Sequence, residues 1–174
     1  LRMIVINMRA RLPVWADAPT RQALLDRFGY AFIRPEGSMY PPILEINDMD
    51  GDVTIDGPGG ALTFTPFLAY HGGMDALGFR VNDVAYLPDA VDLPDASWDH
   101  LRNLRCWIVD ALRREPHPTH SHLAKTLGWI ADMAPETAVL TNMHNDLDYA
   151  TLSDETPDHI QPAFDGMQLT FPLS

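Results

Sequence analysis

Histidine and aspartate side chains follow several short apolar runs of this sequence, at the point where each run ends. His71 follows "TPFLAY", Asp89 comes just after "VAYL", Asp110 ends "CWIV", and His144 comes shortly after "AVLTN". Imidazole and carboxylate groups together suit zinc, manganese or iron. Sites in open α/β sheets collect at the ends of strands, so this repetition predicts a metal centre along one edge of a sheet.

The stretch "PHPTHSHL" adds three histidines before a predicted helix. His117 lies between prolines, which hold its backbone extended, and His122 falls inside the helix, where its direction follows the helix face. His120 lies at the junction, where free backbone N–H groups and the helix dipole favour a phosphate. The sequence therefore predicts that His120 binds a phosphate and donates a proton to a departing oxygen. We expect His100 and His159 to be surface residues.

Each of these residues also has an ordinary structural explanation. Asp89 could be a turn or cap residue, and His71 could open a flexible turn with the glycine pair that comes after it. The histidine loop could be solvated, with His120 or Ser121 capping the next helix. No HExxH or CxxC motif is present. The metal prediction therefore depends on the spaced set and not on any single residue.

Composition limits the classes of protein that this chain can represent. Its 174 residues are 46% hydrophobic and 9% aromatic, which is enough for one core, so we expect a single domain over residues 1–174. The net charge of −12 and the pI near 4.7 disfavour binding to a nucleic acid polymer or to anionic lipid. Cys106 is the only cysteine, so there is no intrachain disulfide, and a reducing, cytoplasmic location is expected. No run approaches the roughly 20 apolar residues of a membrane helix.

The apolar patterns predict mostly strands as far as residue 89 and alternating strands and helices after Pro94. We expect strands over 12–16, 43–47, 52–55, 61–70, 76–81, 84–89, 106–112 and 137–142, and helices over 18–30, 94–104 and 121–133. Ser121 is a candidate cap of the last helix, and a closing hairpin is expected over 161–171 with its turn at Asp165-Gly166. The sheet should be mixed and covered by helices, which is an α/β fold.

Several of these blocks together carry a resemblance to a known family. They are "FTPFLAYHG", "VAYLPDAVDLP", "IVDALRREPHPTHSHL", "AVLTNMHNDLDY" and "PAFDGM". They resemble the second half of a metallo-β-lactamase-fold phosphodiesterase, in the branch of the phosphoribosyl 1,2-cyclic phosphate phosphodiesterases. The resemblance implies an αββα sandwich with mixed sheets, of which this chain is the larger, C-terminal part. The family's HxHxDH motif is absent here, and "LR" at the start resembles the residues directly after that motif, so we expect an N-terminally incomplete domain.

The resemblance also assigns roles to individual residues. By position, His71, Asp89 and His144 correspond to metal ligands, with Asp89 as the carboxylate that bridges two ions. His120 corresponds to the histidine that protonates the leaving oxygen, and His117 and His120 are expected to bind substrate. Family members have a histidine where this chain has Asn142, and His144 is the substitute. Behind the ligands, Asp110 and Asn142 are expected as supporting residues.

The implied function is hydrolysis of a small phosphodiester, a cyclic sugar phosphate or nucleotide ester, by a hydroxide held between two divalent ions, Zn or Mn. Without the upstream ligands, this chain alone is expected to hold metal weakly and to be inactive. One alternative is a domain that binds a nucleotide or sugar phosphate without turnover. Another is a different hydrolase of the same fold, a nuclease or a thiolesterase, although no basic arm for RNA is present. The expected partner is a small phosphate ester, not a nucleic acid polymer or a membrane, and a homodimer stays open.

Overall fold

The computed structural model describes residues 1–171 and divides them into two compact units. The first unit is Leu1–Val53 and the second begins at Thr54. The single domain expected from the length of the chain stays a prediction.

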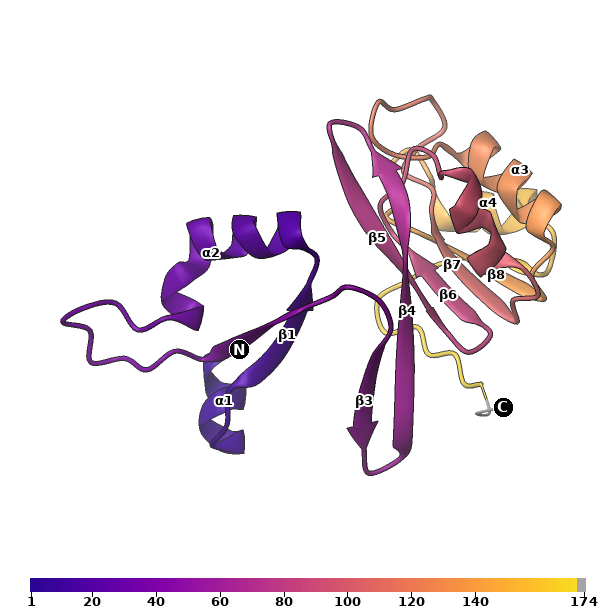
Figure 1. Ribbon diagram of the computed structural model, residues 1–174. Helices are drawn as coiled ribbons and strands as arrows, with labels where there is room; N and C mark the ends of the chain where they lie inside the picture. The colour runs from indigo at the N-terminus through magenta and orange to yellow at the C-terminus, as the bar shows by residue number, and fades with distance from the viewer. Residues whose placement is uncertain (172–174) are drawn as a thin grey trace. The chain divides into compact units, whose positions relative to one another are not determined.

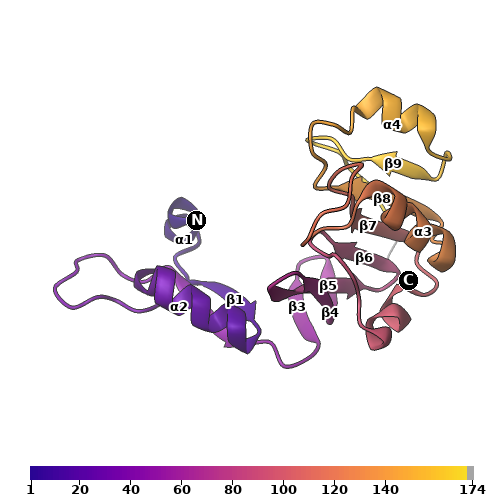
Figure 2. The same cartoon turned by 90° about the horizontal axis from the view of Figure 1, so that it is seen from above.

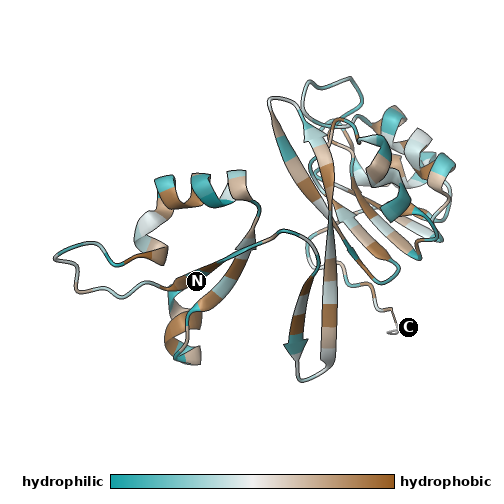
Figure 3. Ribbon diagram, viewed as in Figure 1, coloured by the Kyte–Doolittle hydropathy of each residue, from teal (hydrophilic) through white to brown (hydrophobic). Residues whose placement is uncertain are grey.

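The first unit is a small α/β arrangement. It consists of α1 (Arg2–Met8), β1 (Leu12–Ala16), α2 (Ala18–Phe32) and β2 (Leu44–Asp48). β1 and β2 pair in parallel, with α2 in the connection between them. Asp17 caps α2 by accepting a hydrogen bond from the backbone N–H of Thr20 at 3.0 Å, and Pro19 lies in the first turn as the sequence predicted. Helix α1 was not predicted; its exposed apolar residues stand out in Figure 3.

The second unit is built on one seven-stranded sheet, shown in Figure 1. Its strands, in spatial as well as chain order, are β3 (Val53–Gly57), β4 (Gly60–His71), β5 (Met74–Val81), β6 (Val84–Leu87), β7 (Cys106–Asp110), β8 (Thr137–Thr141) and β9 (Ile160–Pro162). β5 is antiparallel to both β4 and β6, whereas β6 to β9 pair in parallel. The mixed sheet confirms the α/β fold expected from the sequence.

The strand directions determine where polar residues gather. Because β5 reverses the chain between β4 and β6, strands β4, β6, β7 and β8 all run the same way. Their carboxyl ends therefore meet at one edge of the sheet. His71, Asp110 and Asn142 lie at or just beyond three of these ends, and Asp89 follows β6 by two residues.

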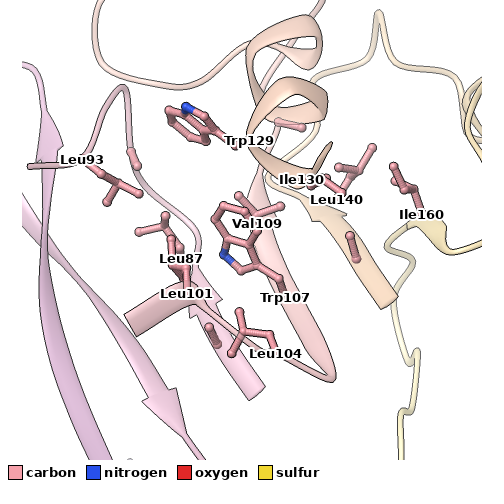
Figure 4. Packing of buried hydrophobic residues seen from close by; sticks show 14 of the residues in the cluster. Leu87, Leu93, Leu101, Leu104, Trp107, Val109, Trp129, Ile130, Leu140 and Ile160 are labelled. Atoms are coloured by element: carbon pink, nitrogen blue, oxygen red, sulfur yellow. The ribbon is translucent and has the colours of Figure 1, made fainter. Parts of the chain in front are cut away.

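Helical segments cover one face of this sheet and enclose the core. They are the 3-10 helix η1 (Asp95–Leu101), α3 (Leu123–Met133) and α4 (Tyr149–Glu155), and Figure 2 shows α3 beside β7 and β8. Figure 4 shows Trp129 and Ile130 of α3 over Val109 and Leu140 of the sheet. The alternate strand residues on this face are fully buried, which fixes the strand register. Within residues 1–171, none of the helices is long and apolar enough to cross a membrane.

Three local predictions were wrong. The segment 94–104 was expected as a helix, but only Asp95–Leu101 is helical, and it is a 3-10 helix. Ser121 does not cap α3, which begins after His122; it is buried and shares a 2.6 Å hydrogen bond with Thr126. The closing hairpin is absent from the described residues, although the turn expected at Asp165-Gly166 is present, with the backbone N–H of Met167 donating to the carbonyl oxygen of Phe164 at 3.0 Å. β9 instead joins β8 in parallel, because α4 returns the chain to the end of the sheet at which β8 began.

Candidate metal centre

Two histidines and one aspartate converge at the edge where the strands end. Ligand atoms of His71, Asp89 and His120 all lie within 4.8 Å of one another, and all three side chains are partly buried. His71 comes from the end of β4, Asp89 follows β6, and His120 lies in the loop between β7 and α3. Two imidazoles and a carboxylate are a donor set that fits a divalent cation such as Zn²⁺. All three residues were predicted from the sequence to lie at one site, with His120 as an acid instead of a ligand.

His120 is held from behind by a buried carboxylate. Its Nδ1 lies 2.8 Å from Oδ2 of Asp110, whose side chain is fully buried at the end of β7. An ionised carboxylate only accepts, so this contact, which is shorter than the 3.2 Å between Nδ1 and the amide nitrogen of Asn142, assigns the proton to Nδ1 and leaves Nε2 of His120 for another partner. The same Oδ2 accepts the backbone N–H of Ala90 at 3.1 Å, so Asp110 joins the loop after β6 to the histidine loop.

Burial and hydrogen bonding act on Asp110 in opposite directions. Its pKa is raised because burial disfavours the charged carboxylate, while the hydrogen bonds from Ala90, His120 and Asn142 oppose that shift. Asn142 contributes through its side-chain amide, which lies 3.4 Å from Oδ1 of Asp110 and 3.3 Å from the carbonyl oxygen of Pro88. Asp110 and Asn142 thus both contact His120, the amide nitrogen of Asn142 at 3.2 Å from Nδ1, and their assignment as supporting residues stays a prediction.

His71 is oriented by the backbone of the histidine loop. Its Nδ1 lies 2.7 Å from the carbonyl oxygen of Thr119. The rings of His71 and His120 meet edge to face, with their centroids 4.5 Å apart. Sequence reasoning missed Thr119, and the only signal for it was the glycine pair after His71. Gly72 has a φ of +71°, and a Cβ added there would lie 2.5 Å from Cγ2 of Thr119.

His117 lies beside His120 without belonging to the group of three. Their ring centroids are 5.3 Å apart. Nδ1 of His117 lies 3.3 Å from the backbone nitrogen and 3.2 Å from the hydroxyl oxygen of Thr119. The pKa of His117 is lowered by loss of hydration, by the charge of Arg113 and by the neighbouring imidazoles His120 and His71.

His144 lies outside the group formed by the described residues. Asn142 has a left-handed backbone with φ of 61°, and the chain then turns so that the backbone N–H of His144 donates to the carbonyl of Leu112 at 2.6 Å. The His144 side chain is exposed, and its Nδ1 lies 3.4 Å from Oδ1 of Asp146. Its assignment as a metal ligand stays a prediction.

Comparison with known proteins identifies the family. Residues 1–144 match the model of the beta-lactamase superfamily domain. A curated relative, an octanoyltransferase of Porphyromonas gingivalis, is 26% identical over 164 residues, which are 90% of this chain and 32% of that protein. The chain thus spans about a third of the length of that relative.

Solved structures give the same fold. The chain resembles a diphosphatase of the PhnP family with 30% identity and a TM-score of 0.82, over 94% of this chain and 60% of that one. Zn²⁺-bound PqqB of Methylobacterium extorquens has 14% identity and a TM-score of 0.68, over 93% and 66% of the two chains. Human tRNase Z, short form, has 12% identity and a TM-score of 0.62, over 94% and 69%. The chain belongs to the beta-lactamase superfamily and has the metallo-β-lactamase fold, and its likeness to the PhnP-family diphosphatase supports the branch inferred from its motifs.

Proposed function

We propose that this chain provides metal-binding and proton-donating residues for the hydrolysis of a small phosphate ester. The observation that carries the proposal is the group of His71, Asp89 and His120 at the strand ends, with His120 paired to the buried Asp110. The 30% identity to a PhnP-family diphosphatase supports phosphate chemistry over the other chemistries of the fold. The substrate class that we propose is a cyclic sugar phosphate or a nucleotide ester.

His71 and Asp89 are the proposed metal ligands, with His144 retained from the sequence analysis. Zn²⁺ or Mn²⁺ bound there would polarise the phosphoryl oxygens and lower the pKa of a water molecule, the usual contribution of such ions. In the protein to which the chain belongs, we propose two such ions. The chain has 24 acidic and 12 basic residues, which favours a small substrate over a nucleic acid polymer.

His120 is the proposed general acid. Its Nδ1–H is committed to Asp110, so the proton it can give away is the one on Nε2 when the ring is charged. Oδ1 of Asp89 lies 3.9 Å from the same Nδ1. In the reaction, a water oxygen forms the new bond to phosphorus while one of its protons passes to solvent, and the bond to the leaving oxygen breaks. The leaving oxygen keeps the electron pair and takes the proton from His120. His117, whose ring lies beside that of His120, is proposed to bind the phosphate.

The test is His120→Ala, assayed in the protein that contains this chain. We expect kcat on a five-membered cyclic phosphodiester to fall by roughly 10²-fold or more, with an unchanged content of metal. His159→Ala is the matched control, because His159 is an exposed histidine of the same chain. A variant that works at the parental rate would refute the acid role, and a variant that loses metal would make His120 a ligand.

The substrate class is tested by assaying the protein that contains this chain with three kinds of compound. Cyclic phosphodiesters or diphosphate esters should be hydrolysed faster than a thioester of similar size. Preference for the thioester would overturn the proposal in favour of a thiolesterase. Tight binding of the phosphate compounds without any product would favour the binding domain that the sequence left open.

A further inference from the structure

Thr119 contacts two of the three histidines of the site and is followed directly by the third. Its carbonyl oxygen lies 2.7 Å from Nδ1 of His71. Its backbone nitrogen and hydroxyl oxygen lie 3.3 and 3.2 Å from Nδ1 of His117. The residue thus presents an acceptor to one imidazole and donors to another.

These contacts decide where each neutral ring carries its proton. A carbonyl only accepts, so Nδ1 of His71 must be protonated, and the lone pair of His71 lies on Nε2. A backbone N–H only donates, so Nδ1 of His117 must be unprotonated, and the proton of His117 lies on Nε2. The two rings are therefore opposite tautomers, with opposite chemistry at the nitrogen that remains available. Nε2 of His71 can bind a cation, whereas Nε2–H of His117 can donate to an anionic oxygen.

Close packing against Gly72 keeps Thr119 in place. Gly72 turns the chain directly after His71 with φ of +71°, and the space that a Cβ would fill is taken by Cγ2 and Cβ of Thr119. Only glycine combines this backbone conformation with so little volume. Gly73, the next residue, has nothing within 4 Å of an added Cβ.

We propose that Thr119 is a positioning residue that assigns opposite tautomers to His71 and His117, so that one serves as a ligand for a divalent cation and the other as a hydrogen-bond donor to a phosphoryl oxygen. The identity of the two ligands rests on the proposed function, whereas the tautomers follow from the hydrogen bonds alone. Gly72 contributes to this positioning, because its lack of a side chain lets Thr119 approach His71.

Two-bond ¹H–¹⁵N correlation spectra of the histidine rings test the assignment in the full chain without metal or substrate. At a pH where the rings are neutral, we expect the Nδ1–H tautomer for His71 and the Nε2–H tautomer for His117. His159, which is exposed, should show no such fixed preference and serves as the internal reference. Finding Nε2–H on His71 or Nδ1–H on His117 would overturn the proposal, and no substitution is needed to see it.

Gly72→Ala tests the role of the packing, with Gly73→Ala as the matched control. The added methyl group should displace Thr119, so the tautomer preferences of His71 and His117 should weaken in Gly72→Ala and persist in Gly73→Ala. Adding Thr119→Ser to Gly72→Ala removes Cγ2, the atom nearest to the new methyl group, and should restore part of the preference. Parental tautomers in Gly72→Ala, or no recovery in the double variant, would contradict the role of Thr119.

Titration with Zn²⁺ alone connects the tautomers to binding. Loss of the residue that orients a ligand typically weakens metal binding 10- to 100-fold, so we expect about a tenfold weaker Zn²⁺ affinity in Gly72→Ala and parental affinity in Gly73→Ala. If the protein that contains this chain binds no Zn²⁺ while His71 and His117 show the expected tautomers, that result would count against the proposed function and leave the positioning role of Thr119 supported. If Zn²⁺ binds but His71 or His117 shows the other tautomer, the positioning role of Thr119 is contradicted and the proposed function is still supported.

Discussion

Oδ2 of Asp110 accepts hydrogen bonds both from Nδ1 of His120, at 2.8 Å, and from the backbone N–H of Ala90, at 3.1 Å. One buried carboxylate therefore fixes a side chain of the candidate site and the loop that carries Asp89. Its contribution to stability and its contribution to the site can be separated by substitution.

Asp110→Ala should lower the free energy of unfolding, because it leaves the N–H of Ala90 and Nδ1 of His120 without their acceptor. The expected loss is roughly 1–3 kcal/mol, the cost of leaving a buried donor unpaired. Asp110→Asn keeps an acceptor oxygen and should lose less. Urea denaturation of the three proteins makes the comparison, and equal midpoints and slopes for parent and Asp110→Ala would show that the carboxylate is not needed for folding.

Gly78→Ala should also destabilise the fold. Gly78 of β5 pairs with Phe67 of β4, whose buried ring occupies the space of a Cβ at Gly78 and stacks on His100 with the ring centroids 5.5 Å apart. This stacking also makes His100 more enclosed than the surface position expected from the sequence. We expect a loss of about 1–3 kcal/mol from overpacking, measured by thermal unfolding.

Gly128→Ala is the control for that substitution. Gly128 lies inside α3 with nothing within 4 Å of an added Cβ, so the change should stabilise by up to about 1 kcal/mol. The two glycine substitutions are thus predicted to have opposite signs. A Gly78→Ala protein as stable as the parent would mean that the ring of Phe67 can move away at no cost.

Acid should weaken the start of α4 through Asp148. The pKa of Asp148 is lowered because its carboxylate accepts hydrogen bonds from the backbone N–H and the hydroxyl of Thr151. A group whose pKa is lower in the folded state stabilises above its unfolded pKa of about 3.9, and the stabilisation is lost as the pH falls through the folded pKa. Asp148→Asn keeps a cap that does not titrate.

The melting temperature of the parent should therefore fall more steeply below about pH 4 than that of Asp148→Asn. All other carboxyl groups are common to both proteins, so the difference between the two curves isolates Asp148. Parallel curves from pH 7 to pH 3 would contradict the capping role.

The strands and their polar ends could be predicted because burial leaves a strong pattern. β7 contains the apolar run 106–109 and ends at Asp110, and β8 contains the apolar run 138–140 and is followed by Asn142. Since parallel strands end at one edge, convergence of His71 and Asp89 followed from the order of the elements. The distance between them was a consequence of topology and not of any local motif.

Other features depended on contacts that sequence patterns do not record. Ser121 looked like a helix cap, but its hydroxyl bonds Thr126 within the core, and the helix begins later. The membership of His120 in the group depends on the path of a loop, and the exposure of His144 depends on the left-handed turn at Asn142. Thr119 acts largely through its backbone carbonyl and N–H groups, which every residue except proline has, so its residue type gives no sign of this role.

The three residues that converge at the site lie on separate segments, so occupancy of the site is linked to the cooperativity of the fold. His71, Asp89 and His120 belong to the end of β4, the loop after β6 and the loop before α3, and an unfolded chain does not hold these segments together. A cation that binds only the folded state adds RT ln(1 + [L]/Kd) to the free energy of unfolding, about 2.7 kcal/mol when its concentration is 100 times Kd. The melting temperature of this chain would then rise with the concentration of free divalent cation. The backbone amide protons of β4, β6 and β7 would also exchange more slowly, and together, as the site fills.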